Sequence, residues 1–161
     1  MAVNPNDAKV NCFYQTDGKT LLPHLFDTEA EKIARTFWGD KQKIKDGKPL
    51  FNKQGEPIME KHGVTSTQLR KFFDEVKRYD RLLSMPNQSW EKQEAYIRML
   101  KSKVAYAVAR VKGDKKYYEH LSEFVNSGIN CVKNADDYHV FTALFEAIYG
   151  FYYEHAPDGN N

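Results

Sequence analysis

Cysteine is scarce in this sequence of 161 residues, and the two cysteines, Cys12 and Cys131, stand far apart without a spaced partner. They form neither a CxxC motif nor the framework of a disulfide-stapled domain. No apolar run approaches the ~20 residues that span a bilayer, and the first residues lack the apolar segment of a secretory signal. We therefore expect a protein of the reducing cytoplasm, without contact to a membrane.

Glycine and proline are also few, with nine and six residues. These counts exclude a collagen-like or low-complexity chain. Aromatic residues are abundant instead, with ten Tyr and ten Phe, which is too many for a disordered chain. A chain of this length buries roughly two-thirds of its extended surface. We predict one helical domain over residues 1–161, with a core over about 25–155.

Motifs of catalysis and metal binding are missing. The five histidines form no HExxH motif and no pair four residues apart, and no GxGxxG, Walker or GxSxG sequence is present. We predict no catalytic residue, no metal and no cofactor. The adjacent Asp136 and Asp137 leave a metal-dependent nuclease as a remote alternative, but acidic residues at a helix start are explained by capping and the macrodipole.

Apolar residues recur at helical spacing in five stretches, which predicts an all-α fold, a compact five-helix bundle. The expected helices span about 28–38, 65–83, 90–111, 115–132 and 135–152. Thr28 with Glu31 and Thr65 with Gln68 have the spacing of capping boxes. Asn134 or Asp136 is expected to cap the fifth helix. Gly128 lies on the apolar stripe of the fourth helix, where we expect it to let a neighbour approach closely.

Residues 39–64 follow neither the helical nor the strand period. The segment contains four glycines, two prolines and six lysines. We predict a long lysine-rich loop after the first helix, a flexible insertion with turns at the sequences DGK and KQGEP.

The formal net charge of +2 argues against a strongly basic chain, but it hides a gradient. Residues 1–65 carry a net charge of +1, residues 66–112 carry +6, and residues 113–161 carry −5. Such asymmetry suggests that one side of the domain binds a polyanion and that the other side binds a different partner.

The basic residues of the second and third predicted helices cluster on one face of each helix. At 100° per residue, five cations of the second helix fall within about 120°, opposite the apolar stripe. They are Arg70, Lys71, Lys77, Arg78 and Arg81. On the third helix, Lys103 and Arg110 share a face with Tyr106, and Arg98, Lys101 and Lys112 flank the core stripe. A solvated amphipathic face is the alternative, but acids are scarce in these arcs, so we favour a surface that binds nucleic-acid backbone.

Three stretches resemble one known family. Residues 65–72 (TSTQLRKF) resemble the start of the main helix in the small subunit of type III-A CRISPR effector (Csm) complexes. Residues 100–110 (LKSKVAYAVAR) resemble its second signature, an apolar helix with Ala-Tyr-Ala and a following Arg. Residues 141–152 resemble its aromatic C-terminal helix, and the likeness covers roughly residues 65–153. Segment 39–64 looks longer than this family needs.

The resemblance implies a non-catalytic, all-helical, RNA-binding subunit. Several copies of it would stack along the duplex of crRNA and target RNA, in contact with one another and with other Csm subunits. Carried over by motif, the RNA-binding residues are Arg70 and Lys71 from the first match and Lys101, Lys103 and Arg110 from the second. Arg78 and Lys112 join them on helical geometry alone.

Two further alternatives remain open at this stage. One is the small subunit of a type III-B CRISPR complex, a helical protein with the same role. The other is a helical protein–protein adaptor that has no nucleic-acid partner. The adaptor predicts no salt-dependent binding of RNA.

Overall fold

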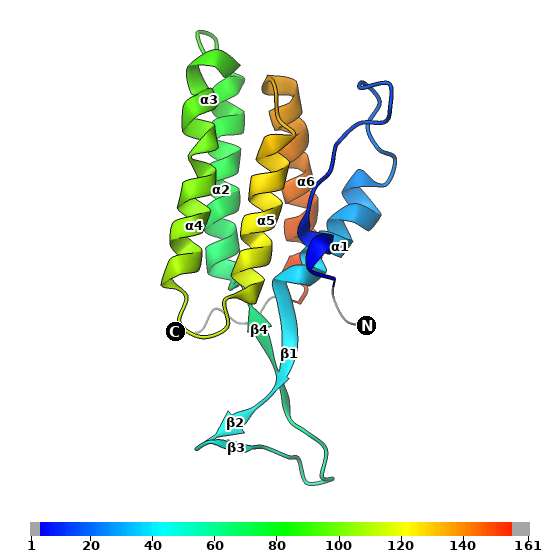
Figure 1. Cartoon of the computed structure of the whole chain (residues 1–161), viewed down its shortest axis with the longest axis vertical. Helices are drawn as coiled ribbons and strands as arrows, with labels where there is room; N and C mark the ends of the chain where they lie inside the picture. The colour runs from blue at the N-terminus through cyan, green and yellow to red at the C-terminus, as the bar shows by residue number, and fades with distance from the viewer. Residues whose placement is uncertain (1–3, 156–161) are drawn as a thin grey trace.

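A computed structural model describes residues 4–155 of the chain. Long helices lie side by side and form the body of the molecule (Figure 1). They are α2 (Ser66–Leu83), α3 (Trp90–Arg98), α4 (Leu100–Arg110), α5 (Lys116–Asn130) and α6 (Ala135–Tyr153). Together α3 and α4 run back along α2, so the C-terminal half of α4 lies near the start of α2 (Figure 1).

The first predicted helix is shorter and less regular than expected. The chain forms a π-helical turn at Leu25–Glu29, then α1 at Ala30–Ala34, then a 3₁₀ turn at Arg35–Phe37. The predicted capping box of Thr28 and Glu31 is wrong, because neither N-terminal boundary of these turns has a side-chain cap. Before this region, a 3₁₀ turn (Pro5–Ala8) leads into Val10 and Phe13, and both side chains are buried in the core.

The later helix starts have their predicted cap residues, but only half of the capping box at Thr65 forms, because the backbone N–H of Thr65 bonds to the Tyr118 hydroxyl and not to the Gln68 side chain. The Thr65 hydroxyl accepts a hydrogen bond from the backbone N–H of Gln68 at 3.2 Å, and the Asn134 amide oxygen accepts one from the N–H of Asp137 at 2.9 Å. The single helix expected over 90–111 is divided at Met99. The N–H of Met99 bonds to the carbonyl of Tyr96, three residues back, so one tight turn separates α3 from α4.

The expectations of an all-α fold and of a long loop after the first helix are wrong. Helices dominate, but residues 38–63 form an antiparallel ribbon, called the β ribbon below. In it β1 (Trp38–Gln42) pairs with β4 (Met59–Gly63), and β2 (Ile44–Lys45) pairs with β3 (Lys48–Pro49). Most of its side chains are exposed or only half-buried, so no apolar alternation marks the strands in the sequence.

The β ribbon extends away from one end of the helical bundle (Figure 1). Its first turn is the expected Asp46-Gly47 pair, in which both residues have positive φ, as a tight β-hairpin turn requires. Its base is held against the bundle. The Lys41 ammonium forms an ion pair with Asp114, and a Cβ atom on Gly39 would overlap the Tyr117 hydroxyl.

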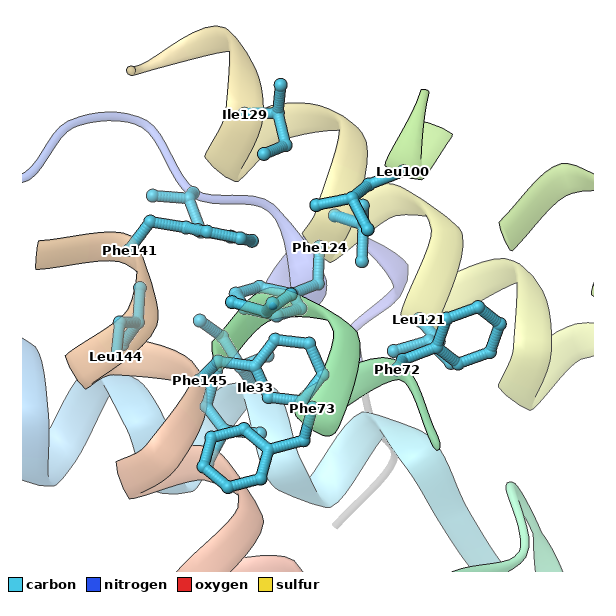
Figure 2. Packing of buried hydrophobic residues seen from close by; sticks show 14 of the residues in the cluster. Ile33, Phe72, Phe73, Leu100, Leu121, Phe124, Ile129, Phe141, Leu144 and Phe145 are labelled. Carbon is cyan, nitrogen blue, oxygen red and sulfur yellow. The ribbon is translucent and has the colours of Figure 1, made fainter. Parts of the chain in front are cut away.

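An aromatic cluster joins the helices (Figure 2). The ring of Phe124 on α5 lies 5.3 Å from that of Phe145 and 5.5 Å from that of Phe141, both on α6. It also lies 6.2 Å from the ring of Phe37. The expectation for Gly128 is confirmed, because a Cβ there would lie 2.5 Å from the Phe141 ring. The close packing of α5 on α6 therefore depends on this glycine.

The described helices do not have the character of membrane spans. Between residues 4 and 155, none combines the length and the apolar character that a bilayer crossing requires.

Candidate nucleic-acid interface

A groove of about 780 Å³ opens between α2 and α4, at the end of the bundle from which the β ribbon leaves. Phe72 on α2 and Ala107 and Val111 from the α4 side are its apolar lining residues. Basic and aromatic side chains also line it. Because α3–α4 runs antiparallel to α2, residues far apart in sequence meet across this groove, such as Glu75 and Lys103, which are 28 positions apart.

Four of the predicted cations line the groove: Lys71, Lys103, Arg110 and Lys112. Among the described residues, Lys71, Arg110 and Lys112 form no ion pair. The Arg110 guanidinium lies 5.4 Å from the centre of the Tyr106 ring and donates a hydrogen bond to its hydroxyl at 3.2 Å. The Tyr106 side chain is 64% exposed. The groove thus offers unpaired positive charge beside an accessible ring.

A shallower hollow continues from the groove along the outer side of α2. It is lined by Thr67, Arg70, Lys71, Asp74, Glu75, Arg78 and Arg81. Lys71 and Glu75 line both hollows, which makes the two surfaces continuous. Arg70 is almost freely solvated, since its Nε lies 3.9 Å from the Asp74 carboxylate and both side chains are largely exposed.

Glu75 is the acidic centre of this surface. Its carboxylate accepts hydrogen bonds from Nε and Nη2 of Arg78 at 3.1 and 3.0 Å, and it also pairs with the Lys103 ammonium. The bonds from Arg78, followed by those from Lys103, lower the pKa of Glu75 to about 2, against the opposing effect of burial. Because the pKa of Glu75 is lower in the folded than in the unfolded chain, its ionised carboxylate stabilises the fold. This contribution to the free energy of unfolding is complete above about pH 4.5 and is lost as the pH falls towards 2.

The structure brings six of the seven predicted site residues to this continuous surface and separates the seventh. Lys101 is two residues from Lys103, and two residues along a helix turn a side chain by about 200°. Its ammonium donates a hydrogen bond to the Asn130 side chain on α5, whereas Lys103 points to Glu75 on α2. Lys101 therefore lies outside the groove, and the role of the other six residues stays a prediction.

Sequence reasoning missed several residues of the surface. One local signal could have identified Glu75 as part of the surface, because Arg78 follows it at the spacing of a helical ion pair. The groove also includes His62, Asp114 and Tyr117, which come from β4, the α4–α5 loop and α5. Binding of the Lys41 ammonium lowers the pKa of Asp114. No pattern in the sequence links these three residues to α2.

Asp137, half of the alternative nuclease site, already has protein partners. One carboxylate oxygen accepts the hydroxyl of Tyr14 at 2.7 Å, and the other accepts the backbone N–H of Lys133 at 2.9 Å. Burial, followed by this bond to Asp137, raises the pKa of Tyr14 to about 12. This carboxylate therefore links Tyr14, which precedes α1, to the start of α6, and the nuclease alternative gains no support.

Comparison with known proteins gave one family. The family model described as Csm2 Type III-A matches residues 41–157, a range that includes most of the β ribbon and the whole groove. The resemblance noted in the sequence is thereby confirmed, and the match favours type III-A over the type III-B alternative. No curated protein and no solved structure matches the chain.

Proposed function

The chain belongs to the Csm2 Type III-A family, and from that premise we propose that it binds the backbones of crRNA and target RNA without catalysing a reaction. As a family member it is the small subunit of a type III-A Csm complex, and the other Csm subunits are its partners. Its own part is structural: it holds the RNA duplex in place, and chemical steps belong to other subunits.

The groove between α2 and α4 carries this proposal. Three unpaired cations, Lys71, Arg110 and Lys112, line it together with Lys103. Phosphate oxygens are the natural ligands of such a group, since Arg and Lys contacts to phosphates position nucleic acid without reading its sequence. The exposed Tyr106 ring beside Arg110 adds a surface on which an unpaired base can stack.

Stacking of several copies along the duplex is the second part of the proposal. Each copy makes few phosphate contacts, so its own affinity is low, and neighbouring copies on one RNA raise the overall affinity through effective concentration. Residues 113–161 carry a net charge of −5. Apart from Asp114, Tyr117 and Tyr118, which line the groove, this acidic part faces protein neighbours, because phosphates repel it.

Binding of labelled single-stranded RNA by the full chain at several salt concentrations tests the function. We expect weak binding that is insensitive to sequence. Three or four phosphates neutralised in the groove, at about 0.7 each, should by themselves make the logarithm of affinity fall with the logarithm of salt concentration with a slope of about −2 to −3, and any further contact outside the groove would make the slope steeper. Crosslinked peptides should come from α2 and α4. Absence of salt-dependent binding would instead support the protein adaptor, and crosslinks concentrated in α6 would contradict the proposed orientation.

Replacing Glu75 by glutamine is expected to strengthen RNA binding by about three- to tenfold. The substitution releases Arg78 and Lys103 from their carboxylate partner and removes a negative charge from the RNA-facing surface. The same titration measures the effect, at neutral pH. Glu31→Gln makes the same change of charge in an exposed ion pair on α1 and should leave the affinity unchanged. Equal effects of the two variants on the affinity for RNA would mean that the affinity depends on the net charge of the chain and not on the position of Glu75.

A further inference from the structure

The tip of the β ribbon, residues 43–58, bears four lysines that the groove does not use. Lys43, Lys45, Lys48 and Lys53 are all exposed, and among the described residues they form no ion pair. The tip has two acidic residues, Asp46 in the first turn and Glu56, whose carboxylate is hydrogen-bonded to the Asn52 amide at 3.0 Å. A positive, solvated end therefore stands away from the bundle (Figure 1).

Apolar side chains are exposed among these lysines. Ile44 is 63% exposed and Phe51 is 56% exposed. Proteins that bind single-stranded nucleic acid without sequence preference combine cations that follow the backbone with rings on which bases stack. Phe51 with its neighbouring lysines supplies both parts on one short element.

The base of the β ribbon is continuous with the groove. His62 and Gly63 of β4 line the groove, and the ion pair of Lys41 with Asp114 fixes the ribbon to the loop that borders it. From Trp38 to Lys45 the extended chain covers about 23 Å at 3.3 Å per residue. An RNA strand that left the groove on this side would meet the ribbon.

We propose that the tip of the β ribbon is a second RNA-binding element, which takes the single-stranded continuation of the RNA held in the groove. This inference rests on the proposed function and adds a site to it. A protein partner fits the tip less well, because lysine is depleted in protein–protein interfaces, whereas nucleic-acid interfaces are strongly positive.

Two variants test the tip. The first replaces Lys43, Lys45, Lys48 and Lys53 by glutamine. The second replaces residues 44–57 by Asn-Gly, since Lys43 and Ile58 are already hydrogen-bonded through their backbones and can close a two-residue hairpin. A control variant replaces four lysines elsewhere in the chain, Lys9, Lys19, Lys32 and Lys133, by glutamine.

Labelled single-stranded RNA is titrated against the full chain and each variant at several salt concentrations. We expect the first variant to weaken binding about tenfold and to reduce the salt slope by about 2 to 3, at roughly 0.7 per lysine. The hairpin replacement should do nearly the same, and the control should match the wild type.

The outcomes separate this inference from the proposed function. If the wild type binds RNA and both tip variants keep its affinity and salt slope, the tip is not an RNA site, and the groove proposal stands. If the tip variants bind RNA normally but no longer co-assemble with the other Csm subunits, the tip docks protein and the inference is overturned. No RNA binding by the wild type would overturn both proposals.

Discussion

A chain with Lys103 and Arg110 both replaced by glutamate is expected to bind RNA about 10- to 100-fold more weakly than the wild type. Both side chains line the groove from α4, seven residues apart and on one face. Reversal removes two phosphate contacts and sets negative charge opposite the backbone. The new carboxylate at position 103 also lies beside Glu75, which then keeps Arg78 alone. Titration with labelled single-stranded RNA measures the loss.

Lys101 supplies a matched control on the same helix. Lys101→Glu makes the same change of charge as Lys103→Glu, but its side chain lies against Asn130 on α5. We expect Lys103→Glu to weaken binding about tenfold and Lys101→Glu to change it about twofold or less. Circular dichroism should confirm that both variants fold. Equal losses would mean that RNA responds to the total charge of α4, and that the groove is not the site.

Replacing Phe124 by alanine is expected to lower the free energy of unfolding by about 3–5 kcal/mol. This side chain is fully buried, and its ring packs against the rings of Phe37, Phe141 and Phe145. Three elements meet on it: α5 and α6, whose rings Figure 2 labels, and the turn before β1, which carries Phe37, so no single shift of a helix fills the cavity. Denaturant unfolding followed by helical circular dichroism measures the loss.

Phe51→Ala is the control for this prediction. It removes the same ring from the tip of the β ribbon, where the side chain is 56% exposed, and should change the free energy of unfolding by about 0.5 kcal/mol or less. A loss above about 2 kcal/mol for Phe51→Ala would show that the ribbon packs on the bundle more tightly than its exposure indicates.

Most helices were predictable because their signals are local. Apolar residues at helical spacing gave α2, α5 and α6, and the caps at Thr65 and Asn134 marked two of the starts. Where geometry depended on neighbours, prediction was wrong. The first helical region begins at Leu25 and not at the predicted residue 28. The break at Met99 divides a stretch whose apolar pattern continues without interruption.

The β ribbon was missed for a different reason. A strand is recognised in sequence by the alternation that burial of one face imposes, and both faces of this ribbon are largely solvated. The two turns were recognised, because glycine with positive φ is a local requirement: Gly47 and Gly55 both have it. The pairing of β1 with β4 joins residues up to 25 positions apart and has no local signal.

The sequence by itself determined the family, the helical faces and the segment that carries the positive charge, because each depends on residues close together in the chain. The tertiary structure alone decided which cations share a surface. It placed Lys71 opposite Lys103, turned Lys101 towards α5 and supplied Glu75 as a shared partner for Arg78 and Lys103. The physical reason is that a charge acts through distances in space, and these are set by how α4 packs on α5 and lies across the groove from α2.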